Sequence, residues 1–320
     1  MACAFLFPGQ GSQAVGMGRS LAAAFPAARE VFEEVDDALN YKLARLMFEG
    51  PESDLTLTEN AQPALMTASI AVLRVLEREG GIDLRDKVAF VAGHSLGEYS
   101  ALAAARTFDL GDTARLLRRR GQAMQRAVPV GDGAMAALLG LDLEAAQAIA
   151  AEAVARTPEG SDPDICDVAN DNAPGQVVVS GHKAAVERAV AVAAERGAKR
   201  SVLLPVSAPF HCRLMQPAAD EMQKALAGIV MRQPTVPLVA NVTAAPVSDP
   251  DTVRDLLVRQ VTGMVRWRES VLAMRRAGVS RTFELGAGKV LTGLVKRIDR
   301  EVAGQSVGEP GDIETVLKLL

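Results

Sequence analysis

Continuous apolar runs alternate with segments of helical periodicity along the first 130 residues. The runs CAFLF (3–7) and KVAFVAG (87–93) contain few polar positions, which is typical of strands buried on both faces of a sheet. Apolar residues three and four positions apart predict helices around these runs, at 18–38, 63–79, 96–105 and 111–127. Buried strands that alternate with helices predict an α/β domain built on a parallel sheet.

A different order of short elements follows residue 130. Strand-like and helix-like patterns alternate there as β-α-β-β-α-β, which is the order of the ferredoxin-like motif. The six segments are AMAALLGL, a helix at 142–156, ICDVAND, GQVVVSG, a helix at 182–197 and RSVLLPVS. We predict that residues 131–205 form a small ferredoxin-like domain inserted into a larger α/β domain, which consists of residues 1–130 and 206–320.

The return segment, residues 206–320, completes the larger domain. Its apolar patterns predict three further helices and two further strands, followed by a short closing segment. They are the helices 213–227, 250–277 and 288–298, the strands PLVANVT (237–243) and RTFELG (281–286), and the closing residues 307–320.

The composition narrows the classes of partner. The chain has 320 residues, 49% of them hydrophobic, and a net charge of -4, so it lacks the basic excess of nucleic-acid-binding proteins. No apolar stretch approaches the roughly 20 residues that a membrane-spanning helix needs. The three cysteines are widely spaced and suit a reducing compartment. We expect a cytoplasmic monomer that binds neither nucleic acid, nor membrane, nor metal.

The segment GHSLG (93–97) has the G-x-S-x-G pattern and lies between a predicted strand and a predicted helix. That context is typical of a nucleophile elbow, a strained turn that exposes the serine. The N-terminus of the helix directs backbone N–H groups and its positive dipole end toward the place where an oxyanion would form. We predict that Ser95 is a nucleophile; a glycine-bordered turn with a capping serine is the alternative.

A nucleophilic serine needs a general base, and histidine is the most common one. Three histidines are present, His94, His182 and His211. His94 adjoins the serine, and neighbouring side chains on an extended segment point apart. His182 ends a predicted strand of the small domain, whereas His211 follows the loop that re-enters the large domain. We therefore predict His211 as the base, oriented by a backbone or amide carbonyl, because no acidic residue stands out.

One arginine of the predicted helix 111–127, Arg120, faces the core. Its neighbours at helical spacing include Leu116, Leu117 and Met124, which belong to the apolar face. A guanidinium in that position needs an anion, because an unpaired buried charge is very costly. The anion is either an internal carboxylate or the carboxylate of a substrate, which arginine binds with two parallel hydrogen bonds.

Together these segments resemble the acyltransferases, and among them the malonyl-CoA:acyl carrier protein transacylases of type II fatty acid synthesis. The resemblance runs over nearly the whole chain and implies a hydrolase-like α/β domain with a ferredoxin-like insert. It is carried by FPGQGSQAVGMG (7–18), ENAQPAL (59–65), GHSLGEYSAL (93–102), RGQAMQRAVPVGDGAMAALLG (120–140), NAPGQVVVSG (172–181), FHCRLMQPAA (210–219) and FELGAGKVLTGL (283–294).

The resemblance also implies roles for single residues. Ser95 is expected to carry the acyl group and His211 to act as its base. The backbone N–H groups of Gln10 and Leu96 are expected to form the oxyanion hole. Arg120 is expected to hold the malonyl carboxylate.

The carbonyl of Gln260, in the segment RQVTGMVRW, is expected from the same resemblance to orient the histidine. Two places depart from the family pattern. Phe210 stands where members often have serine, and Gly263 and Met264 stand where Asn-Pro is common. In related polyketide acyltransferases, phenylalanine before the histidine accompanies malonyl rather than methylmalonyl, so a malonyl substrate is expected here.

The implied activity is a ping-pong transfer of the malonyl group from malonyl-CoA to the phosphopantetheine thiol of holo acyl carrier protein. The carrier protein is then a transient partner, and no cofactor is permanently bound. A stand-alone acyltransferase that serves a polyketide synthase is a close alternative. A serine esterase or thioesterase is a more distant one, because a buried Arg120 does not suit generic lipid esters, which carry no carboxylate.

Overall fold

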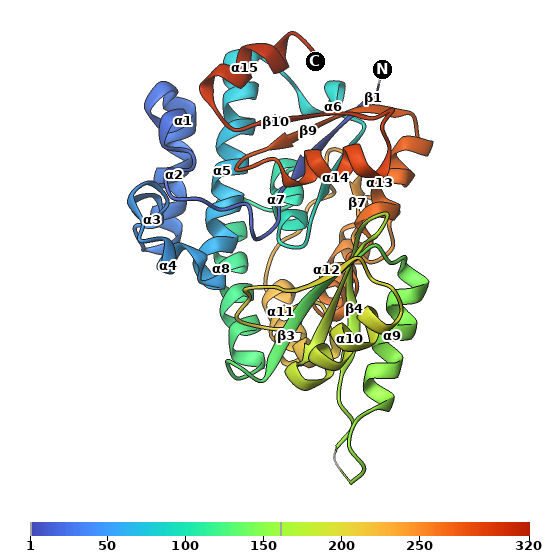
Figure 1. Ribbon diagram of the computed structural model, residues 1–320. Helices are drawn as coiled ribbons and strands as arrows, with labels where there is room; N and C mark the ends of the chain where they lie inside the picture. Colours follow the sequence, from blue (N-terminus) through green and yellow to red (C-terminus); the bar gives the residue numbers. More distant parts are fainter. Residues whose placement is uncertain (1, 161) are drawn as a thin grey trace.

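The computed structural model describes residues 2–160 and 162–320 of the chain. Two sheets organise them, a mostly parallel sheet of six strands and an antiparallel sheet of four (Figure 1). The strands of the large sheet, in spatial order, are β10 (Ala303–Val307), β9 (Val279–Leu285), β1 (Ala2–Phe7), β2 (Phe90–Gly93), β7 (Leu238–Val239) and β8 (Pro246–Val247). Among these six, β8 alone runs antiparallel to its neighbour.

Strand β1 is buried on both faces, as its continuous apolar sequence predicts. Phe5 and Phe7 belong to the apolar core on one side of the sheet, whereas Ala4 and Leu6 belong to the core on the other side. The first core is built with α5 (Thr58–Gly80), α7 (Gly97–Ala104) and α8 (Leu110–Ala127), and the second with α13 (Trp267–Arg276) and α14 (Val290–Ile298).

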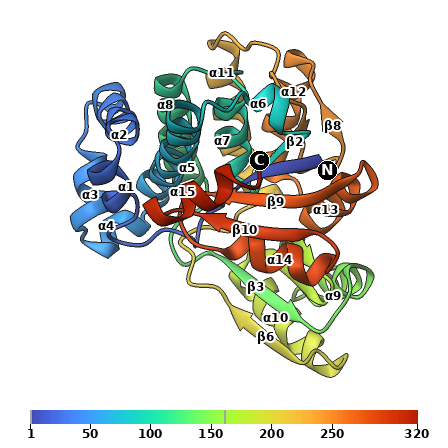
Figure 2. The ribbon, with the colours of Figure 1, turned by 90° about the horizontal axis from the view of Figure 1, so that it is seen from above.

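Further helices extend these layers. Figure 2 shows four of them grouped beyond α5 and α8, namely α1 (Arg19–Ala24), α2 (Pro26–Leu39), α3 (Leu43–Glu49) and α4 (Glu52–Thr56). The others are α6 (Leu84–Lys87), a 3-10 turn (Arg213–Met215), α11 (Gln216–Ala227), α12 (Pro250–Thr262) and α15 (Pro310–Leu317). In the part of the chain that the structure describes, no helix is both long and apolar enough to cross a membrane.

The antiparallel sheet has the spatial order β4 (Cys166–Ala173), β5 (Gln176–His182), β3 (Gly133–Leu139) and β6 (Arg200–Leu203). With α9 (Leu143–Ala155) and α10 (Lys183–Glu195), its elements follow one another as β3-α9-β4-β5-α10-β6. The predicted ferredoxin-like order is therefore confirmed. Ala136 and Val179 pack under the two helices, whereas Met135 and Val178 pack against the larger core. The domain boundaries drawn at 131 and 205 stay a prediction.

The predicted helix 250–277 is wrong, because α12 and α13 are separate helices with a break at residues 263–266. Val265, inside the break, pairs with the edge strand β4. Its N–H donates to the oxygen of Ala169 at 2.9 Å, and its oxygen accepts from the N–H of Asp171 at 3.0 Å. These bonds satisfy backbone groups at a buried sheet edge, and that gain outweighs the helical periodicity of the local sequence.

Other differences from the predicted elements have equally local causes. The predicted helix 18–38 is interrupted at Phe25, because the following Pro26 disfavours helical backbone in the residue before it. The strand predicted at 237–243 is only two residues long in the sheet. Strand β10 and helices α3 and α4 were not predicted, because segments of five to seven residues are too short to show a period.

Candidate active site

Ser95 lies in a tight turn between β2 and α7. Its φ of 53° is in the left-handed region, which residues other than glycine rarely adopt. The flanking glycines are required by space. A Cβ at Gly93 would lie 1.9 Å from the carbonyl carbon of Gly97, and a Cβ at Gly97 would lie 2.1 Å from the backbone oxygen of Phe7. The turn therefore has the geometry of a nucleophile elbow.

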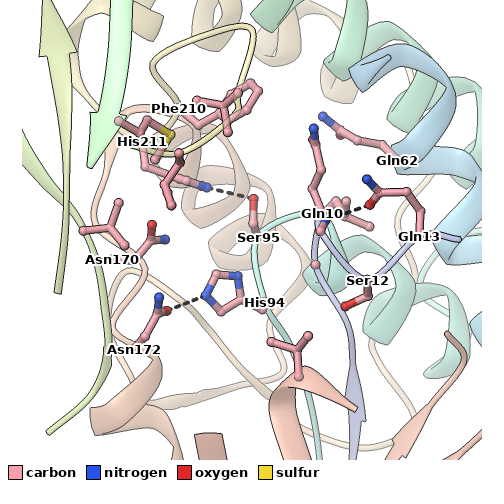
Figure 3. A pocket seen from close by; sticks show the side chains of 18 of the residues that line it. Gln10, Ser12, Gln13, Gln62, His94, Ser95, Asn170, Asn172, Phe210 and His211 are labelled. Carbon is pink, nitrogen blue, oxygen red and sulfur yellow. Dashed lines mark hydrogen bonds between the residues drawn. The ribbon is translucent and has the colours of Figure 1, made fainter. Parts of the chain in front are cut away.

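His211 reaches Ser95 from the loop before α11 (Figure 3). Its Nε2 lies 2.8 Å from Ser95 Oγ, and its Nδ1 lies 2.8 Å from the backbone oxygen of Gln260. A carbonyl only accepts, so Nδ1 carries the hydrogen and Nε2 is left to accept the serine proton. Burial and the nearby charge of Arg120 lower the pKa of His211 to about 3, so the imidazole is neutral at neutral pH.

Arg120 is buried beside the serine, with 1% of its surface exposed. Its Nη1 donates to Gln62 Oε1 at 2.9 Å, and its Nη2 donates to Gln260 Oε1 at 2.9 Å and to Ser95 Oγ at 3.2 Å. Within residues 2–160 and 162–320, no carboxylate lies within 4.0 Å of this guanidinium. The internal ion pair that the sequence left open is therefore not formed, and the charge is held by neutral oxygens.

The pocket around Ser95 lies between the two sheets and has a volume of about 530 Å³. One wall carries Gln10, from the loop after β1, and Gln62, from α5. The opposite wall carries Asn170 and Asn172 of β4 (Figure 3). Both halves of the fold thus contribute polar groups to one cavity.

Gln10 and Leu96 both line this pocket. Their backbone N–H groups have no hydrogen-bond acceptor in the described part of the chain. The loop that carries Gln10 lies close to the elbow, because a Cβ at Gly9 would be 2.8 Å from the backbone oxygen of His94. Unpaired backbone N–H groups beside a serine are what an oxyanion hole requires.

Comparison with known proteins supplies the family. The sequence model of the acyl transferase domain matches residues 4–307. The chain belongs to the acyltransferase family. It is 48% identical, over 316 residues and 99% of both chains, to the malonyl CoA-acyl carrier protein transacylase of Escherichia coli strain K12.

Solved structures of similar acyltransferases match over the whole chain. The crystal structure of acyl-carrier-protein-S-malonyltransferase from Bartonella henselae is 56% identical and has a TM-score of 0.96, covering 100% of this chain and 99% of that one. A malonyl transacylase in complex with its type II polyketide synthase acyl carrier protein is 42% identical, with a TM-score of 0.93 and full coverage of both chains.

Several polar residues of the acyltransferase site were missed by the sequence analysis, among them Gln62, which binds Arg120, and two residues at the elbow. Asn241, just after β7, joins the two sides of the elbow. Its Oδ1 accepts from the N–H of Ser95 at 2.8 Å, and its Nδ2 donates to the oxygen of Gly93 at 2.7 Å. Glu98, in the first turn of α7, accepts from Gln260 Nε2 at 2.6 Å and from the N–H of Asn241 at 3.3 Å. A polar residue inside an otherwise apolar helix or strand was the available signal for both.

The other two histidines of the acyltransferase do not bond to the serine. His94 points to the small sheet, where its Nε2 lies 2.8 Å from Asn172 Oδ1, and its ring packs against Trp267 (Figure 3). His182 ends β5, and its Nδ1 accepts from the N–H of Ile165 at 2.9 Å. Of the three histidines, His211 is the one that lies within hydrogen-bond distance of Ser95 Oγ, and its role as the base stays a prediction.

Proposed function

We propose that this acyltransferase moves a malonyl group from malonyl-CoA to the phosphopantetheine thiol of acyl carrier protein, for fatty acid synthesis. The observation that carries the proposal is Arg120, a buried cation 3.2 Å from the hydroxyl of Ser95, with no carboxylate partner among the residues that the structure describes. An acyl group on that serine which itself carries a carboxylate would supply the missing anion. The names of the similar proteins support the same substrate pair.

The first half-reaction loads the serine. His211 Nε2 takes the proton of Ser95 Oγ while the oxygen attacks the thioester carbonyl carbon of malonyl-CoA. The backbone N–H groups of Gln10 and Leu96 stabilise the resulting oxyanion. When the intermediate collapses, the C–S bond breaks and the CoA thiolate leaves with the proton from His211. The product is a malonyl ester of Ser95.

The second half-reaction transfers the malonyl group from Ser95 to the carrier protein. His211 takes the proton of the phosphopantetheine thiol, and the thiolate attacks the ester carbonyl. Collapse breaks the C–O bond, and Ser95 Oγ leaves with the proton held by His211. Arg120 holds the malonyl carboxylate through both halves. The cycle uses side chains and backbone groups of this chain, and we infer a cytoplasmic monomer that meets the carrier protein transiently.

A second candidate is transfer to the carrier protein of a polyketide synthase. One similar structure is named as a transacylase in complex with such a carrier, but the curated relatives, named malonyl CoA-acyl carrier protein transacylases, do not favour this alternative. The chemistry at Ser95 is the same in both, so the carrier protein alone separates them. Side-by-side transfer rates to a fatty acid carrier and to a polyketide carrier decide between the two.

The test of the proposed function is an intact-mass measurement after mixing with malonyl-CoA. We expect one malonyl adduct in the native protein and none in the Ser95→Ala protein. Addition of holo acyl carrier protein then removes the adduct and yields malonyl carrier protein. Release of free malonate without carrier product would instead identify a thioesterase.

A further inference from the structure

A second buried charge lies beyond Arg120 and takes no part in the proposed cycle. Glu98 has 1% of its surface exposed and lies in the first turn of α7. Its Oε2 accepts the two hydrogen bonds from Gln260 and Asn241, whereas its Oε1 has no partner among residues 2–160 and 162–320. Burial raises the pKa of this carboxyl to about 7. A buried carboxylate with one unpaired oxygen is costly, so its presence beside the nucleophile points to a role.

The amide of Gln260 joins Glu98 to Arg120. Its Oε1 accepts from Arg120 Nη2 at 2.9 Å, and its Nε2 donates to Glu98 Oε2 at 2.6 Å. The reversed amide would set its NH₂ against the guanidinium donors and its oxygen against the carboxylate. The cation on one side and the anion on the other therefore fix the orientation of the amide. Carboxylate, amide and guanidinium form a polarised chain of hydrogen bonds.

Through the Gln260 amide, Glu98 serves as a counter-charge of Arg120 without touching the guanidinium. No carboxylate touches the guanidinium, and its Nε is unpaired in the described part of the chain. A direct ion pair would occupy donors that a substrate carboxylate needs. A carboxylate behind an amide offsets part of the charge of Arg120 and leaves the guanidinium accessible from the pocket, which Arg120 lines.

We propose that Glu98 is a positioning residue and, in its ionised form, the counter-charge of Arg120, and that this charge limits how strongly the site favours acyl groups that carry a carboxylate. This inference rests on the proposed function. A malonyl carboxylate on Arg120 is attracted by the guanidinium and repelled by Glu98, whereas an acetyl group feels neither. Glu98 thereby keeps the malonyl ester from being held too tightly to leave.

The test is the Glu98→Gln variant, which keeps the size and an acceptor oxygen and removes the charge. Equimolar malonyl-CoA and acetyl-CoA compete for Ser95, and intact mass gives the initial ratio of the two adducts. We expect the malonyl-to-acetyl ratio to rise about tenfold over the native protein, the effect of one charge a few ångströms beyond the guanidinium. The ratio is internal to each sample, so it does not depend on the fraction of folded protein.

The matched control is Glu284→Gln. Glu284 is also buried, but its carboxylate accepts from the backbone N–H groups of Leu291 and Thr292, at the start of α14, and has no bridge to Arg120. We expect its adduct ratio to stay within about twofold of the native value, because the change does not alter the charge beside the guanidinium.

Other outcomes distinguish a failure of the role of Glu98 from a failure of the proposed function. An unchanged or lowered ratio in Glu98→Gln, with the malonyl adduct still formed, overturns the role of Glu98 and leaves the proposed function intact. No malonyl adduct in the native protein overturns the proposed function itself. If Ser95 of the Glu98→Gln protein is acylated too slowly for the adducts to be measured, the Kd of malonyl-CoA is measured instead. It is expected to be about tenfold lower in Ser95→Ala/Glu98→Gln than in Ser95→Ala. Equal values contradict the inference.

Discussion

At the scale of the residue, Arg120 is the group to which we assign the selectivity of the site. Neutral oxygens of Gln62, Gln260 and Ser95 surround its guanidinium, and these bonds hold the side chain without neutralising it. Burial lowers the pKa of Arg120, but a guanidinium stays protonated in proteins. The site therefore presents a buried positive charge beside Ser95 before any substrate arrives.

Replacement of Arg120 by alanine removes this charge. We expect the rate of acylation by malonyl-CoA to fall about 100-fold or more, because a buried charge-assisted pair contributes about 3 kcal/mol. Acylation by acetyl-CoA is expected to change by less than about fivefold, since acetyl carries no charge to lose a partner. Rapid-quench measurement of both adducts checks this, and an equal loss for the two substrates would show that Arg120 is only structural.

The charge of Arg120 also contributes to the low pKa of His211. The pKa of His211 lies at about 3, lowered first by burial and then by Arg120. Native acylation by acetyl-CoA is therefore expected to show no acid limb from this histidine between about pH 5 and 8. Removal of a neighbouring cation favours the imidazolium, so Arg120→Ala is expected to move the acid limb up by about one pH unit.

The Glu98→Gln protein, which keeps Arg120, is the control for this pH profile. Its acid limb is expected to coincide with that of the native protein, because Glu98 is not among the groups that shift the pKa of His211. An acid limb in Arg120→Ala at the native position would mean that burial alone sets the pKa of His211.

Sequence could indicate Ser95, His211 and Arg120 because each has a local mark: a G-x-S-x-G turn, a scarce residue type, and a charge on an apolar face. Glu98 and Asn241 have only a weaker mark, a polar residue in an otherwise apolar segment, which does not indicate a partner. Their partners lie 162 and 146 positions away along the chain, in Gln260 and Ser95 respectively. Periodicity compares residues a few positions apart, so bonds of this kind are visible only once the chain is folded.

At the scale of the element, the strand-turn-helix unit of β2 and α7 depends on close backbone approach. Gly97 packs against the backbone of β1, and a Cβ there would lie 2.1 Å from the oxygen of Phe7. Strand β1 is the centre of the large sheet, between β9 and β2, so it has little freedom to move away.

We expect Gly97→Ala to lower the free energy of unfolding by about 3 kcal/mol, as overpacking against a rigid backbone does. The malonyl adduct is expected to form at least about 100-fold more slowly, because a shift of the turn misplaces Ser95. Urea unfolding and intact mass measure the two effects. Gly293→Ala is the control: a Cβ there meets nothing within 4 Å, and the helix α14 is expected to gain about 0.5–1 kcal/mol.

The break between α12 and α13 shows where the prediction of elements fails. The sequence of 250–277 has a helical period on both sides of the break, and only Gly263 hints at an interruption. The cause is the strand β4, which is about 95 positions earlier in the chain and offers a free edge to Val265. Strand β10 is a similar case, since its pairing with β9 decides its conformation more than its own residues do.

At the scale of the whole molecule, contacts beside the active site connect strand β4 of the small sheet to the large domain. Asp171 of β4 is 1% exposed and forms a two-bond ion pair with Arg268 of α13, at 2.9 Å and 3.2 Å from Nε. The backbone of Val265 bonds to both neighbours of Asn170, a residue that lines the pocket. The far wall of the pocket is thereby held in place by the segment that follows Gln260.

Replacement of Arg268 by alanine leaves Asp171 buried without its partner. We expect the free energy of unfolding to fall by about 2 kcal/mol, less than for a fully buried pair because Arg268 is partly exposed. The KM for malonyl-CoA is expected to rise with little change in the identity of the adduct. Urea unfolding and steady-state kinetics check this, against Lys318→Ala, whose exposed pair with Glu314 is expected to contribute at most about 0.5 kcal/mol.

The backbone of Ser95 has a consequence for anyone who needs an inactive form of this enzyme. A residue with a Cβ at a φ of 53° lowers the stability of the protein by about 1 kcal/mol, and here that residue is Ser95 itself. A substitution by glycine usually lowers the stability of a protein, but at this φ it is expected to raise it relative to alanine. We expect the free energy of unfolding of Ser95→Gly to exceed that of Ser95→Ala by about 1 kcal/mol, although both variants lack the hydroxyl. Thermal or urea unfolding of the two variants measures the stability that the enzyme loses by placing a side chain in this backbone conformation.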